Sequence, residues 1–325
     1  MTMLLATFYQ IVQMLLVLAL APLLTGWVRL VKARLVGRRG PSPLQPYRDL
    51  LRLLRKEVVL ARNASWLFRA VPYLMFTAIW LAAGLVPVFT TQLALAPTAD
   101  LIALIALLGS ARFFLALAGM DIGTSFGGIG SSREMMIAAL AEPAMLMVVF
   151  SVSILVRTTS LAEIADFMMS GAVGLRISLA LALIALIMVA IAENARIPID
   201  NPATHLELTM VHEAMVLEYS GRHLALVEAA SMLKMLLYMG LIACIFVPWG
   251  MATATTGAAG VGQGIVAALW GMIAFVLKLA VGGALLALFE TSIAKMRVFR
   301  VGEFLGGALL LSLLGAIFLY VSRGV

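Results

Sequence analysis

The sequence has only one cysteine, Cys244, in a chain of 325 residues. A single thiol cannot form a disulfide framework, and it cannot supply the several cysteine ligands of an iron–sulfur cluster. The sequence also lacks the CxxCH, HExxH and Walker motifs, which attach haem, bind catalytic zinc and hold nucleotide phosphates. We therefore expect no metal site, no cofactor and no catalytic residue in this chain.

Charged residues are also scarce, since they make up 12% of the chain, whereas a soluble domain carries about 25%. Hydrophobic residues supply 63% of the sequence, and the mean hydropathy is +1.08. This composition is typical of an integral membrane protein. The loops between the apolar runs are short, so we expect residues 1–325 to form a single polytopic membrane domain.

Long apolar runs rich in Leu, Ala and Met indicate helices, because a segment in lipid must satisfy its own backbone polar groups. The sequence predicts an all-α protein with about eight transmembrane helices and shorter amphipathic and loop helices on the cytoplasmic side. The expected spans are about 4–31, 67–89, 100–119, 136–157, 175–193, 224–249, 263–289 and 303–321.

Most of the 23 basic residues fall in loops on one side of these spans, above all in the segment 29–69. Cytoplasmic loops of membrane proteins carry an excess of Lys and Arg, so we expect this side to face the cytoplasm and both termini to lie outside. The net charge of +7 then reflects membrane topology and contact with anionic lipid, and it does not indicate binding to nucleic acid.

The segment 29–69 has two parts. Residues 40–46 contain three prolines and predict an irregular turn, and the pattern from Tyr47 to Val58 predicts an amphipathic helix in the membrane interface. Such a helix is either a basic lipid anchor or a docking surface for a cytoplasmic partner. The docking candidates on this side are Arg38, Arg39, Gln45, Arg48, Arg52, Arg133 and Arg196.

A second loop, at about 118–136, is rich in glycine. It does not follow a strand, so we expect its glycines to permit an irregular backbone near a partner or cavity and not to bind a nucleotide. Ser131 or Ser132, with Glu134 nearby, is expected to start the next helix. Glu142 then lies inside a span beside Pro143, where a carboxyl group is costly; it is either part of a functional site or a structural ion-pair partner.

The most polar stretch is residues 193–221, which lies between two apolar spans. Asn201 and Pro202 are typical of a helix start, and Gly221 is typical of a helix end, so we expect a polar helix between them. His205 and His212 share a face of this helix about 10 Å apart, too far for both to bind one metal ion. We expect them to be structural.

Carboxylates that lead into membrane helices are typical of proton relays. We expect Lys234, inside a span, to be the counter-charge of a carboxylate, because an unpaired buried ammonium is costly. The relay candidates are Glu142, Glu193, Asp200, Glu207, Glu213, Glu218, Glu228 and Lys234.

Several of these segments resemble subunit 1 of respiratory complex I, the H-type membrane subunit. The resemblance rests on Glu193, Arg196, Pro198 and Asp200, on the segment 218–221, and on Gly40-Pro41 with the segment 44–46. A complex I subunit would carry further acids where this chain has Ala203, Thr204 and His205.

All four loops on the basic side resemble more closely the homologous subunit of group 4 energy-converting [NiFe]-hydrogenases, such as formate hydrogenlyase and hydrogenase-4. The matching segments are RRGPSPLQPYRDLLRLLRKE, DIGTSFGGIGSSREM, IPIDNPATHLELTMVHEAMVLEYSG and ETSIAKMRVFR.

This resemblance implies a non-catalytic subunit in the bacterial or archaeal cytoplasmic membrane. It would anchor a peripheral arm of hydrogenase-like and iron–sulfur subunits, which hold the iron–sulfur clusters and the NiFe centre. It would also link electron transfer there to proton or sodium translocation by antiporter-like membrane subunits.

Two alternatives remain open at this point. The first is the quinone-facing subunit of a complex I-like NADH dehydrogenase, and the second is a free-standing ion transporter. A transporter usually shows internal repeats and paired broken helices. We see no convincing repeat, and the acidic residues concentrate at one membrane edge.

Overall fold

The computed structural model describes residues 2–170, 176–196, 211–253, 261–293 and 300–323. Within these ranges the fold is helical and contains no strand. The elements are α1 (Thr2–Leu35), α2 (Gln45–Leu54), α3 (Trp66–Leu85), η1 (Ala96–Thr98), α4 (Leu101–Asp121), α5 (Ser125–Val156), α6 (Leu161–Met169), α7 (Ile177–Glu193), α9 (His212–Val216), α10 (Gly221–Phe246), α12 (Val261–Ser292) and α13 (Val301–Arg323).

Seven of the described helices are long and apolar enough to cross a membrane, namely α1, α3, α4, α5, α10, α12 and α13. The apolar helix α7 has 17 residues, a length of about 25 Å, which is slightly less than the roughly 30 Å hydrocarbon core of a bilayer. Each predicted span therefore corresponds to a helix, and the chain is an all-α integral membrane protein.

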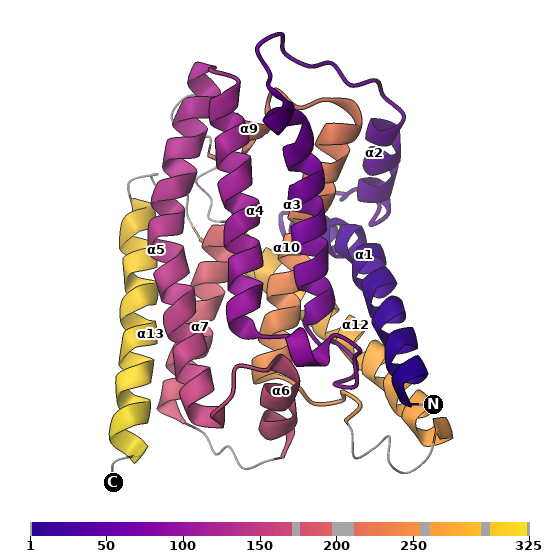
Figure 1. Cartoon of the computed structure of the whole chain (residues 1–325), viewed down its shortest axis with the longest axis vertical. Helices are drawn as coiled ribbons and strands as arrows, with labels where there is room; N and C mark the ends of the chain where they lie inside the picture. Colours follow the sequence, from indigo (N-terminus) through magenta and orange to yellow (C-terminus); the bar gives the residue numbers. More distant parts are fainter. Residues whose placement is uncertain (1, 171–175, 197–210, 254–260, 294–299, 324–325) are drawn as a thin grey trace.

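The helices form one elongated bundle (Figure 1). α2 and α9 lie at one end, which we call the α2 end, and α6 lies at the other, which we call the α6 end. The start of α1 and the end of α13 are both at the α6 end, as an even number of crossings requires. Which end faces the cytoplasm stays a prediction from the basic residues.

The core lies where α3, α4, α5, α7 and α10 pack together, and the peripheral helices cover it. α13 packs against α5 and α7 on one flank, while α12 packs along α1 on the other (Figure 1). Most side chains of α12 and α13 are not buried in this chain. Because both helices are apolar, these surfaces face lipid or other membrane subunits.

The prediction for the glycine-rich loop was wrong, because this segment is helical. α5 begins at Ser125, where the Thr124 hydroxyl accepts a hydrogen bond from the backbone of Gly127, so Ser131 and Ser132 are not its start. A Cβ atom on Gly127 would lie 2.1 Å from the carbonyl oxygen of Gly119 on α4. The glycine therefore permits close helix packing and not an irregular backbone.

Gly221 also differs from its prediction, because it begins α10 and does not end the preceding helix. Its φ of +54° favours glycine, and an added Cβ would lie 2.5 Å from the carbonyl oxygen of Glu57. The only described helix before it in the polar stretch is α9, with 5 residues. Asn201, Pro202 and His205 lie outside the described residues.

Candidate functional site

The centre of the candidate site is Arg112, a base in the middle of the apolar helix α4. Its side chain is 5% exposed and three carboxylates approach it. Nε lies 3.4 Å from Glu134, Nη1 lies 3.7 Å from Glu142, and Nη2 contacts Glu193 directly. A single guanidinium thus joins two positions of α5 to the end of α7.

Lys234 of α10 completes this group, since its Nζ lies 2.9 Å from Oε2 of Glu193. The Glu193 carboxylate is 2% exposed and contacts Arg112 through its other oxygen. The structure thus places Lys234 against one of the carboxylates it was expected to pair with. We call Arg112, Glu134, Glu142, Glu193 and Lys234 the Arg112 cluster.

The Arg112 cluster contains three carboxylates and two bases, so it carries one excess negative charge when all five groups are ionised. An uncompensated charge is costly in the membrane interior. Binding of one proton removes this cost. Glu142 is the most accessible carboxylate, with 45% of its side chain exposed, and its contact with Arg112 exceeds ordinary hydrogen-bond length.

Glu134 and Glu142 are about two turns apart on α5 and reach Arg112 from different levels. Among the described residues, Nε and Nη1 of Arg112 have no direct hydrogen-bond partner. The Arg112 cluster is therefore an ion-paired group in which these two guanidinium nitrogens can still bind water or form new ion pairs.

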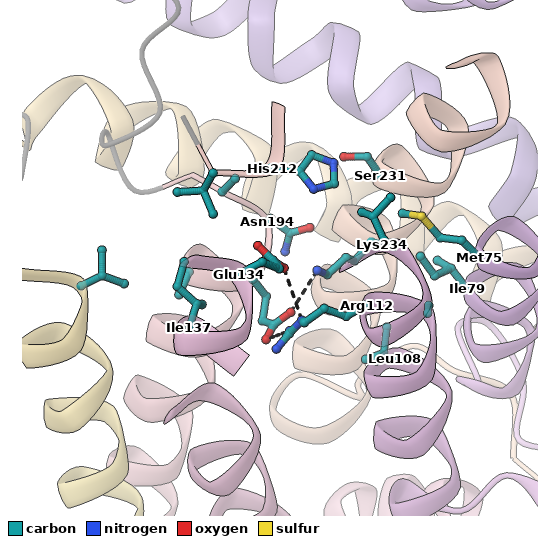
Figure 2. A pocket seen from close by; sticks show the side chains of 17 residues that line it. Met75, Ile79, Leu108, Arg112, Glu134, Ile137, Asn194, His212, Ser231 and Lys234 are labelled. Atoms are coloured by element: carbon teal, nitrogen blue, oxygen red, sulfur yellow. Dashed lines mark ion pairs between the residues drawn. The ribbon is translucent and has the colours of Figure 1, made fainter. Parts of the chain in front are cut away.

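The Arg112 cluster borders a cavity of about 80 Å³, with room for several water molecules. Figure 2 shows Arg112, Glu134 and Lys234 turned toward one another, with His212 and Ser231 beyond them. Burial lowers the pKa of His212, and the Glu134 carboxylate opposes this shift only in part. The imidazole is therefore neutral at pH 7 and able to accept a proton or a hydrogen bond.

A larger polar cavity of about 450 Å³ continues from this one toward the α2 end. His212, Asn194, Ala195 and Ser231 line both cavities, so the two adjoin. The larger cavity is also lined by Arg29 and by two predicted relay residues, Glu213 and Glu228. The structure thus places Glu193, Glu213, Glu228 and Lys234 along two adjoining cavities, and Glu142 joins them only through its contact with Arg112.

The other relay candidates are not placed along these cavities in the described part of the chain. Asp200 and Glu207 lie outside the described residues, and Glu218 is a partly exposed residue that lines neither cavity. Sequence reasoning missed Arg112 and Glu134 as site residues. A base inside an apolar run is the signal that could have identified Arg112; Glu134 was interpreted only as a helix-start residue.

A second ion-paired group lies at the end of α12. Glu290, whose side chain is 6% exposed, lies 2.7 Å from Lys32 Nζ and 3.3 Å from Arg196 Nη1. Arg196 also donates a hydrogen bond to the sulfur of Met235. Arg196, a predicted docking residue, is therefore only partly available at the surface.

The remaining docking candidates lie at the α2 end. Arg38 and Arg39 are exposed in the turn before α2, Arg48 and Arg52 are exposed on α2, and Arg133 is half-buried on α5. Within α2, Asp49 accepts a hydrogen bond from Gln45 and pairs with Arg52 at 3.3 Å. The Tyr47 hydroxyl donates to the carbonyl of Ala19, and burial raises its pKa.

No group of three or more His, Cys, Asp or Glu side chains is arranged to hold a metal ion in the part of the chain that the structure describes.

The sequence is similar to that of known membrane subunits. It is 35% identical to formate hydrogenlyase subunit 4 of Escherichia coli (strain K12), over 90% of this chain and 92% of the relative. It is 33% identical to hydrogenase-4 component C of the same organism, over 75% of this chain and 76% of the relative.

The fold is shared with a chain in a structure of the membrane-bound sulfane sulfur reductase, an archaeal respiratory membrane complex. The TM-score is 0.74 at 19% identity, and the match covers 95% of this chain and 99% of that chain. The model of one family, described as NADH dehydrogenase, matches residues 9–321. Since this match covers nearly the whole chain, the protein belongs to the NADH dehydrogenase family, within which its sequence is similar to hydrogenase subunits.

Proposed function

We propose that this chain is the membrane-anchoring and coupling subunit of an energy-converting complex of the formate hydrogenlyase or hydrogenase-4 type. The observation that carries this proposal is the Arg112 cluster, which two adjoining cavities connect to the α2 end of the bundle. The similarity to formate hydrogenlyase subunit 4 supports it.

In this proposal the α2 end faces the cytoplasm and docks a peripheral arm of hydrogenase-like and iron–sulfur subunits. The arm holds the iron–sulfur clusters and the NiFe centre, and this chain holds none. The distribution of basic residues supports this orientation in a bacterial or archaeal cytoplasmic membrane, with both termini outside. Antiporter-like membrane subunits contact the lipid-facing helices.

Proton transfer starts in the polar cavity at Glu213 and Glu228 and passes His212 on its way to the Arg112 cluster. Uptake of one proton neutralises the excess negative charge of the cluster. Arg112 contacts several carboxylates at once, so its guanidinium can strengthen one ion pair as another carboxylate becomes neutral. Glu142, which is partly exposed, passes the proton to the neighbouring membrane subunit.

The test compares electron transfer with ion translocation in sealed vesicles. We expect Glu193→Gln to assemble, because two carboxylates then balance two bases without a bound proton. Glutamine cannot carry a proton, so translocation linked to turnover should fall by at least about tenfold. Activity with a soluble dye, which bypasses the membrane, should be retained.

The control is Glu163→Gln, which removes an exposed carboxylate of α6 at the opposite end and should leave both activities unchanged. Co-purification of the peripheral arm verifies assembly. Undiminished translocation in an assembled Glu193→Gln complex would show that the carboxylate is structural and would reject the relay.

A second candidate, the quinone-facing subunit of a complex I-like dehydrogenase, is favoured by the family match. Mass spectrometry of the solubilised native complex separates the two. Hydrogenase-like subunits are expected with this chain, whereas subunits of a quinone-reducing dehydrogenase would support the alternative.

A further inference from the structure

A third cavity, which the proposed relay does not use, lies between α7, α10 and α12. Its volume is about 300 Å³, within the size range of small-molecule sites. The lining is apolar except near Asn194, Arg196 and the Tyr238 side chain. Asn194 lines all three cavities, and Arg196 lines both this cavity and the larger polar cavity.

This cavity runs along the membrane-spanning direction. It extends from Ile187 on α7 to Asn194 directly after α7, and from Gly282 to Phe289 on α12, about 10 Å in each case at 1.5 Å per residue. Two of its lining side chains are open to the surface of the bundle, Ile187 at 38% and Leu285 at 61% exposed. An apolar chain can therefore enter from the surrounding bilayer.

An ion-paired group with more bases than acids lies at the end of the cavity toward the α2 end. Arg196 lines the cavity and shares the carboxylate of Glu290 with Lys32. Within this group of described residues, two bases against one carboxylate leave one positive charge. Both bases are partly open to solvent, with 26% of the Arg196 side chain and 48% of the Lys32 side chain exposed. An anionic group bound at this end would neutralise the remaining positive charge.

We propose that this cavity binds an acyl chain of an anionic phospholipid, whose phosphate contacts Arg196 and Lys32. The apolar lining and the lateral opening fit the acyl chain, and the positive end fits the phosphate. A helix of a partner subunit is too wide for this volume, because its diameter is about 10 Å. A neutral quinone head would leave the positive charge at the end of the cavity unbalanced.

Occupation by lipid has a consequence for the neighbouring Arg112 cluster. The cavity lies against Asn194 and Ile191, which adjoin Glu193 on α7. A bound acyl chain fills this side with hydrocarbon and keeps water from reaching Glu193 laterally. Water then reaches Glu193 through the cavity at the Arg112 cluster and not through the lipid site.

The experiment uses the purified membrane complex, loaded in turn with phosphatidylglycerol and phosphatidylcholine and analysed by native mass spectrometry. We expect preferential retention of phosphatidylglycerol. Arg196→Gln should lower this preference about fivefold, the effect of removing one base near an anionic headgroup. Arg34→Gln, which removes an exposed base of α1 that does not line the cavity, should leave the preference unchanged.

A second pair of variants tests the acyl-chain site independently of charge. Leu285→Trp places a large side chain in the opening and should displace the bound lipid. Leu277→Trp makes the same change at a similarly exposed position of α12, 64% exposed, which does not line the cavity, and should retain it. Two outcomes would overturn the proposal: equal loss of bound lipid in both variants, or equal retention of both lipids by the wild-type complex. Either outcome would mean that the complex carries only annular lipid. Displacement of a quinone in place of phospholipid by Leu285→Trp would overturn it as well.

Discussion

At the scale of the residue, Arg112 determines how the buried acids are arranged. Without it, Glu134, Glu142 and Glu193 would bring three carboxylates together against a single base, Lys234. The shared guanidinium joins the three acids into one ion-paired group. The property proposed for the relay therefore belongs to the group and not to one member.

The pH dependence of stability tests the lowered pKa of His212. Its pKa is lowered by burial, so between pH 6.5 and this lower value the unfolded chain binds a proton that the folded protein does not. The free energy of unfolding should therefore decrease as the pH falls below about 6.5, by up to about 1.4 kcal/mol per pH unit. We expect His212→Gln to reduce this decrease, measured by thermal unfolding at about pH 7.5 and about pH 5.5. An identical decrease in variant and wild type would show that His212 is not the responsible group.

At the scale of the element, α4 and α5 must approach closely for Arg112 to reach α5. The Gly127 contact with Gly119 brings the two helices together at one end, and the buried Ser131 hydroxyl donates a hydrogen bond to the carbonyl of Ala116, 2.8 Å away. The short connection between α4 and α5 keeps them antiparallel. Helix packing thus sets the spacing of the Arg112 cluster.

Two neighbouring glycines provide a matched test of this packing. Gly127→Ala should destabilise the protein by about 1–3 kcal/mol, because the new methyl group overlaps the Gly119 carbonyl. Gly128→Ala should be neutral or stabilising by up to about 1 kcal/mol, because no atom lies within 4 Å of an added Cβ there. Thermal unfolding in detergent measures both. Equal effects would show that the close contact does not limit the approach of α4 and α5.

The helix α2 and the turn before it form the exposed basic element. If it docks the peripheral arm, the double substitution Arg38→Glu and Arg39→Glu should release the arm into the soluble fraction, while the chain stays in the membrane. The release should increase with salt, because rim charges act through screened electrostatics. The control reverses the charge of two other arginines, Arg157 and Arg176, which lie near the α6 end. If the arm stays bound at ordinary ionic strength, the element is a lipid anchor.

At the scale of the whole molecule, the ends of the bundle have different chemistry. The larger polar cavity and the exposed basic element formed by α2 and the turn before it lie toward the α2 end, whereas the start of α1 and the end of α13 lie at the α6 end (Figure 1). This asymmetry is expected for a protein that exchanges protons and binds partners on one side. Because the two ends differ, labelling one residue at each end can measure the orientation of the protein in the membrane.

Cysteine labelling tests the orientation directly. Ser42→Cys lies in the exposed turn before α2, and Ser322→Cys lies near the end of α13. We expect an impermeant thiol reagent to reach the first from the cytoplasmic side and the second from the outside. The native Cys244 is buried and should remain unlabelled. Labelling of both sites from the same side would refute the topology with an even number of crossings.

The sequence alone was sufficient for the membrane class and for the helices that cross it. An apolar run of about 20 residues has to satisfy its backbone hydrogen bonds internally, so its length and composition predict a spanning helix directly. The same local information marked Glu142 and Lys234 as costly charges that need partners. It was misleading at Gly127 and Gly221, because a glycine required for close packing has the same local signature as one required for a turn or helix end.

Only the tertiary structure decided which charges meet. Arg112, Glu134, Glu193 and Lys234 come from four helices far apart in the sequence, and no local pattern encodes their contacts. The same holds for Glu290, which joins Lys32 to Arg196 across three separate segments. Burial in a low-dielectric interior makes each charge require a partner, and helix packing alone determines which partner is within reach.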